Sequence, residues 1–188
     1  MDLSFILQSV LLGVGLAMDA FSVSLANGLR EPSMSVPRMA GIAGTYAGFQ
    51  FLMPMIGWFF VHTAAEHFSA VQPYIPWIGF GLLMWIGGKM IWEGLQKKTE
   101  EVPPAVSFRD LMIQGVATSI DALSVGFTIS SYGTAQALTA SLIIAAVTFA
   151  LCLGGLRLGR AFGMKLSSGA SLLGGCILVA IGVKILLT

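Results

Sequence analysis

Two aspartates lie in the middle of apolar segments that are long enough to cross a lipid bilayer. Asp19 belongs to the run MDAFSV at residues 18–23, and Asp121 belongs to the run IDALSV at residues 120–125. A charged side chain at bilayer depth costs about 3 kcal/mol even on lenient insertion scales, so intramembrane acids are rare and usually mark an ion or substrate path. We therefore interpret the repeated motif as the functional centre of the chain.

Other oxygen-bearing side chains accompany the aspartates. Thr118 and Ser124 share one helical face with Asp121, and Ser22 follows Asp19 by about one turn. Another apolar segment contains Tyr46 and Gln50, followed by Pro54, whose ring and missing N–H free the carbonyl of Gln50. Such oxygens suit a hard or borderline divalent cation such as Mn²⁺, Mg²⁺ or Ca²⁺. We predict a metal site formed by Asp19, Asp121, Gln50, Ser22, Ser124, Thr118 and Tyr46.

The composition indicates an all-α integral membrane protein. The mean hydropathy is +0.86, and 56% of the 188 residues are hydrophobic while 10% are charged. The net charge of +1, with no basic patch interleaved with aromatic residues, argues against a nucleic-acid partner. Asp2 and the lack of a basic leading region suggest that the first apolar run is kept as a helix. Apolar runs predict six transmembrane helices at about 5–28, 39–63, 75–95, 110–131, 136–161 and 166–187.

A single polar linker divides the predicted helices into two groups of three. Residues 96–107 combine charged side chains with two prolines, a composition that breaks helices and favours solvent. We expect a first three-helix repeat at 1–95, a cytoplasmic linker at 96–107 and a second three-helix repeat at 108–188. Together they form one transmembrane domain.

The two groups resemble each other in sequence. A shift of 102 positions places Asp19 on Asp121, and a shift of 95 places Lys89 on Lys184. The second and fifth helices match weakly, with little more than Gly57 over Gly159. The pattern predicts an internal repeat of three helices.

Basic residues set the expected orientation. Lys and Arg occur in the first, third and fifth connections and are absent from the second and fourth. The positive-inside rule therefore predicts that both termini lie outside. Because each repeat has an odd number of spans, the repeats would insert with inverted topology, an arrangement of many secondary transporters whose sites lie near the midplane.

Several ordered motifs resemble the MntP-type manganese efflux pumps of the lysine exporter superfamily. They are MDA at 18–20, PMIGW at 54–58, GGKMIWEG at 87–94, TSIDA at 118–122 and IGVKIL at 181–186. The resemblance implies export of Mn²⁺ across the bacterial inner (plasma) membrane by a multi-pass protein, with the two Asp-Ala motifs carrying the function. Mn²⁺ would be the transported substrate, and no cofactor is implied. Some relatives have Glu where this chain has Gln50.

We therefore expect a secondary transporter rather than an enzyme. In our hypothesis Mn²⁺ binds between Asp19 and Asp121, alternating access releases it outside, and protons return in antiport. One alternative is an exporter of another small cation or of an amino acid, although the spans contain no obvious Arg to bind a substrate carboxylate. Another is an intramembrane aspartyl protease, but Asp121 follows Thr-Ser-Ile rather than Gly-x-Gly. A non-transporting scaffold would tolerate neutral residues at both positions.

Overall fold

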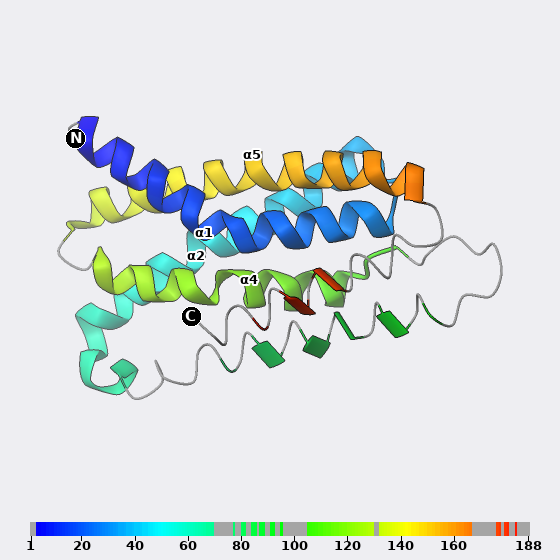
Figure 1. Cartoon of the computed structure of the whole chain (residues 1–188). Helices are drawn as coiled ribbons and strands as arrows, with labels where there is room; N and C mark the ends of the chain where they lie inside the picture. Colours follow the sequence, from blue (N-terminus) through cyan, green and yellow to red (C-terminus); the bar gives the residue numbers. More distant parts are fainter. Residues whose placement is uncertain are drawn as a thin grey trace.

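The chain forms an all-helical bundle in the part that its structure, a computed structural model, describes (Figure 1). The described residues are 3–69, 105–129 and 132–166, with isolated positions between 77 and 95 and between 176 and 183. Four long helices lie side by side along roughly one axis. They are α1 (Leu3–Arg30), α2 (Val36–Ser69), α4 (Phe108–Thr128) and α5 (Thr134–Leu166).

These helices correspond to the first, second, fourth and fifth of the predicted spans, and most of their ends extend a few residues further. The third and sixth predicted spans, at 75–95 and 166–187, lie largely outside the described residues, as does most of the linker at 96–107. The isolated positions described between 77 and 95 and between 176 and 183 are helical.

The distribution of side chains suits a bilayer. Large apolar side chains such as Leu11 and Leu142, each 62% exposed, face outward, whereas Gln50 and Gln114 are fully buried. Water-soluble proteins have the opposite tendency. Both α1 and residues 134–162 of α5 contain stretches that are long and apolar enough to cross a membrane. The all-helical membrane class expected from the composition agrees with these features.

Small residues bring α1 and α5 into direct backbone contact. A Cβ atom on Gly13 would lie 3.1 Å from Cα of Ile144, and a Cβ atom on Gly28 would lie 3.0 Å from Cα of Gly159. Residue numbers therefore rise together along the contact, so the two helices are parallel, as Figure 1 shows. Small side chains allow this close approach, which is typical of membrane helix pairs.

The packing of α2 against α4 follows the same pattern. A Cβ on Gly115 would meet the ring of Phe49, and a Cβ on Gly57 would lie 3.1 Å from Cα of Gly126. These helices are also parallel to each other. They run opposite to α1 and α5 (Figure 1).

The two parallel pairs make corresponding contacts. Gly57 faces the carbonyl of Leu123 and Gly126, while Gly155 faces the carbonyl of Phe21 and Ser24. A shift of 102 relates α1 to α4, and a shift of 98 then relates α2 to α5. The sequence comparison of Gly57 with Gly159 is therefore wrong by one helical turn. One glycine match in an apolar helix does not separate positions a turn apart, whereas backbone contacts do.

Ser107 caps the N-terminus of α4, and its removal should weaken this helix. The Oγ atom of Ser107 accepts a hydrogen bond from the backbone N–H of Asp110 at 3.1 Å. We expect Ser107→Ala to lower the free energy of unfolding by about 1 kcal/mol, because a backbone donor loses its partner. Denaturant titration in mixed micelles measures this change. Ser107→Asp keeps an acceptor and should retain the parent's stability; equal stability of the Ala variant would contradict the capping role.

Candidate functional site

Gln50 joins three helices in the interior of the bundle. Its side chain, carried by α2, is fully buried. The Nε2 atom donates hydrogen bonds to the carbonyl oxygen of Leu16 in α1 at 3.2 Å and to that of Thr118 in α4 at 3.0 Å. The shift of 102 also relates Leu16 to Thr118. Gln50 therefore lies where equivalent points of α1 and α4 approach each other.

The other end of the same amide is an available acceptor. Two carbonyl oxygens require donors, and this fixes the NH₂ group of Gln50 on their side and the oxygen on the other. Among the residues that the structure describes, none donates a hydrogen bond to Oε1 of Gln50. A buried acceptor without a donor costs free energy. This oxygen is thus suited to bind a cation or a water molecule.

Pro54 supplies a second available oxygen nearby. It is buried in the interior of α2, and the helix continues through it. Because proline has no N–H, the backbone carbonyl of Gln50 loses the hydrogen bond that it would accept from the residue four positions later. The amide oxygen and the freed carbonyl belong to the same residue.

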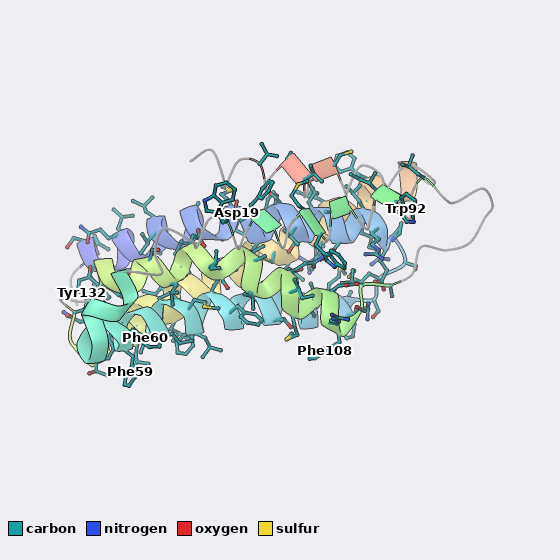
Figure 2. The ribbon with its side chains drawn as sticks, turned by 90° about the horizontal axis from the view of Figure 1, so that it is seen from below. Asp19, Phe59, Phe60, Trp92, Phe108 and Tyr132 are labelled. Atoms are coloured by element: carbon teal, nitrogen blue, oxygen red, sulfur yellow. The ribbon has the colours of Figure 1, made fainter. Side chains whose placement is uncertain are left out.

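The two aspartates flank the level of Gln50. Asp19 and Asp121 each lie three residues after the residue whose carbonyl accepts a hydrogen bond from Gln50. Three residues correspond to a rise of about 4.5 Å along a helix. Since α1 and α4 run in opposite directions, Asp19 lies toward the Arg30 end of the bundle and Asp121 toward the other. Figure 2 shows Asp19 near the middle of the bundle's length. Side chains of a helix lean toward its N-terminus, so both carboxylates lean back toward Gln50.

The aspartates and the nearby serines lie nearer the bundle surface than Gln50 does. Asp19, Ser22 and Ser124 are half-buried, and Asp121 is exposed. Oδ1 of Asp121 accepts a hydrogen bond from the N–H of Ala122 at 2.8 Å. The hydroxyl of Ser22 donates to the carbonyl of Met18 at 2.9 Å. These acidic and hydroxyl groups border the four described helices, whereas Gln50 is within them.

Thr118 is a predicted site residue that contacts Gln50 directly. It is 1% exposed, and its carbonyl accepts from Gln50 while its Oγ1 donates to the carbonyl of Gln114 at 2.9 Å. Its hydroxyl oxygen keeps lone pairs for a ligand. The structure thus brings Thr118 and Gln50 into direct contact.

Tyr46 lies apart from this group, one turn nearer the Arg30 end. Its hydroxyl donates to Oε1 of Gln114 at 2.6 Å and accepts from Nδ2 of Asn27 at 2.8 Å. Asn27 also donates to the same Gln114 oxygen at 2.7 Å and accepts from Nε2 of Gln114 at 3.3 Å. All three side chains are fully buried. We call Asn27, Tyr46 and Gln114 the polar triad.

Asn27 was missed in the sequence analysis. The available signal was an amide inside an apolar helix, where a buried polar group requires partners. Its partners are on two other helices, so the sequence alone could not identify them.

A cation at this site would be held mainly by oxygens that are not acidic. Within the described parts of the chain, no group of three or more His, Cys, Asp or Glu side chains is placed to hold a metal ion. The donors are amide, hydroxyl and backbone oxygens, with the two aspartates beside them. This oxygen-rich set favours hard or borderline divalent cations.

Comparison with known proteins connects this chain to a family of efflux pumps. A family model described as "Putative manganese efflux pump" matches residues 33–186. A protein of Methanosarcina mazei named "Putative manganese efflux pump MntP" is 42% identical over 180 residues, which cover 96% of this chain and 95% of that protein. Proteins of the same name from Sorangium cellulosum and Ruminiclostridium cellulolyticum are 40% and 39% identical, with 95% of this chain and 94% and 93% of theirs covered. No solved structure matches the chain.

Proposed function

Because the chain belongs to the MntP family of manganese efflux pumps, we propose that it exports Mn²⁺ from the cytoplasm through a site between α1, α2 and α4. The family implies a transporter rather than an enzyme. The observation that carries the proposal is the buried Gln50 amide. Its NH₂ group donates hydrogen bonds to backbone carbonyls of α1 and α4, and its oxygen accepts no hydrogen bond from the described residues.

The proposed architecture is six transmembrane helices in two inverted three-helix repeats, at residues 1–95 and 108–188, joined by the linker 96–107. The corresponding glycine contacts of α1 with α5 and of α4 with α2 support this arrangement. So does the bridging position of Gln50 between Leu16 and Thr118, since equivalent points of two inverted repeats meet at their pseudo-twofold axis.

The proposed location is the bacterial inner membrane, with both termini outside. Arg38 supports a cytoplasmic assignment for one end of the bundle: it forms an ion pair with Glu31 at 2.7 Å and donates to the carbonyl of Val106 at 2.8 Å. The loop before α2 and the segment before α4 therefore share that end. Gly28 of α1 packs against the backbone of Arg160 there, which adds the end of α5. A cluster of Arg residues at one end is typical of the cytoplasmic side.

In the proposed mechanism Mn²⁺ exchanges water for the oxygens around Gln50. The amide oxygen and the freed backbone carbonyl of Gln50 bind the ion, and Asp19 and Asp121 balance its charge from either side. Thr118, Ser22 and Ser124 add hydroxyl groups along the path. Rocking of the two repeats about this level would open the site alternately to each side. The carboxylates would return protonated after releasing the metal, which gives proton antiport.

Gln50 should determine the apparent affinity for the metal. We expect Gln50→Met to raise the Mn²⁺ concentration for half-maximal flux by about tenfold, because the amide oxygen is lost from the site. Gln50→Glu restores an oxygen at this position and should transport Mn²⁺ with a smaller change. Mn²⁺ uptake by proteoliposomes measures both.

The matched control is Gln8→Met, which makes the same exchange at an exposed position of α1. In this variant, Mn²⁺ flux should depend on Mn²⁺ concentration as it does in the parent. If Gln50→Met folds and keeps that dependence as well, Gln50 is not a ligand and the proposed site is wrong.

A further inference from the structure

The polar triad lies in the interior of the described helices, between the Gln50 level and the Arg-rich end. Asn27 comes from α1, Tyr46 from α2 and Gln114 from α4, so its four hydrogen bonds tie three helices together. On each helix the triad lies between the residue at the Gln50 level and the end that carries Arg30 and Arg38. An ion moving between that end and Gln50 among α1, α2 and α4 would meet the triad.

The corresponding positions on the other side of Gln50 are apolar. The shift of 102 positions relates Asn27 to Ile129 and Gln114 to Leu12. The shift of 98 positions relates Tyr46 to Ile144. Ile129 is 2% exposed and Ile144 is fully buried. Leu12 packs against a core cluster that contains Ile144. Corresponding positions on the two sides of Gln50 are therefore polar on one side and apolar on the other.

We propose that Asn27, Tyr46 and Gln114 form the inner gate of the transporter, and that Leu12, Ile129 and Ile144 form an apolar outer gate. This inference rests on the proposed function and deepens it. When the inner gate opens, water and the hydration shell of an entering divalent cation take over the hydrogen bonds of the amides and the phenol. The outer gate closes instead by excluding water from apolar side chains.

Gln114 is the central member of the inner gate, because its Oε1 atom accepts from both Asn27 and Tyr46. Replacing it by leucine removes the acceptor of the Tyr46 hydroxyl and of one N–H of Asn27 in the closed state only, since water satisfies both donors in the open state. The substitution should therefore shift the population toward the state that is open to the cytoplasm. Tyr46→Phe removes one donor and should shift it less.

Cysteine accessibility measures this shift directly. Ala117, 1% exposed and packed in the same core cluster as Tyr46, lies between Gln114 and Thr118 and provides the reporter position. The full chain with Cys152→Ala, Cys176→Ser and Ala117→Cys is placed in inside-out vesicles without metal and treated with a membrane-impermeant thiol reagent. We expect Gln114→Leu to raise the labelling rate by at least about fivefold over the otherwise identical protein.

Leu12→Ala is the matched control, because it alters the equivalent position of the outer gate. It should not raise labelling from the cytoplasmic side. Unchanged labelling in a folded Gln114→Leu protein, or an equal rise with Leu12→Ala, overturns the proposal. If Gln114→Leu aggregates, Tyr46→Phe replaces it in the experiment. We expect a smaller rise in the labelling rate, and an unchanged labelling rate again overturns the proposed gate.

Mn²⁺ flux measured with the same reporter proteins separates this inference from the proposed function. If the parent moves no Mn²⁺ while labelling rises in Gln114→Leu, the proposed substrate is wrong and the gate holds. If the parent moves Mn²⁺ and labelling stays constant in both triad variants, the function holds and the gate is wrong.

Discussion

Asp19→Asn and Asp121→Asn should each reduce Mn²⁺ flux by roughly a hundredfold or more, the largest loss of function expected from a single substitution. Asparagine keeps the size and one oxygen of aspartate but removes its negative charge. The other donors around Gln50 are neutral, so each variant leaves one carboxylate to balance a dication. Neither variant provides two protonatable groups for the return step. Radioactive or fluorescent Mn²⁺ uptake by proteoliposomes measures the loss.

Glu31→Gln is the control for this pair of variants. Glu31 lies in the loop between α1 and α2, where it pairs with Arg38 from the first turn of α2. Because Glu31 lies at the Arg-rich end, away from the Gln50 level, we expect the flux of this variant to stay close to that of the parent. Parent-like flux in correctly folded Asn variants would remove the aspartates from the mechanism.

Gly159→Ala should cause the largest loss of stability. A Cβ atom here would collide with the carbonyl of Leu25 and lie 2.9 Å from the backbone nitrogen of Leu29 and 3.0 Å from Cα of Gly28. The obstructing atoms are backbone atoms of α1, so no side-chain rotation relieves the contact. We expect α1 and α5 to separate locally and the free energy of unfolding to fall by about 3 kcal/mol. Denaturant titration in mixed micelles measures this change.

Gly154→Ala makes the same chemical change on the same helix. A Cβ atom at Gly154 would meet no atom within 4 Å. Because alanine is the better helix former, this variant should be as stable as the parent or slightly more stable. Equal stability of the Gly154 and Gly159 variants would contradict the close packing of α1 on α5.

The sequence predicted the described helices well because long apolar runs constrain them strongly. The spans expected at 5–28 and 39–63 are α1 (Leu3–Arg30) and α2 (Val36–Ser69). The helices extend further because backbone hydrogen bonding continues beyond the apolar core, into residues such as Arg30. By contrast, α4 ends at Thr128, before the predicted 131, where the chain turns toward α5.

The grouping of the polar residues was harder to predict. Tyr46 and Gln50 share a helical face, so the sequence favoured a common site for them. In the structure each meets different partners, Tyr46 the triad and Gln50 the carbonyls of Leu16 and Thr118. Spacing within one helix determines which residues share a face. Which residues of another helix meet that face depends on how the helices pack. Here close glycine contacts determine the packing, and residue spacing within one helix does not predict them.

Asn27 illustrates the same limit. Nothing in its own helix distinguishes it as a ligand, a gate or a packing residue, because its role depends on Tyr46 and Gln114 from two other helices. The repeated Asp-Ala motif was informative for the opposite reason: an acid in an apolar span is costly wherever the helix packs, so its presence alone indicates function.

The most direct test of the account is Mn²⁺ movement by the purified full chain in proteoliposomes that also contain a pH-sensitive dye. We predict that Mn²⁺ crosses the membrane down an imposed gradient while protons move in the opposite direction, and that protein-free liposomes show neither movement. A folded, reconstituted protein that moves no Mn²⁺ would contradict the proposed function, and Mn²⁺ movement without proton movement would contradict the antiport.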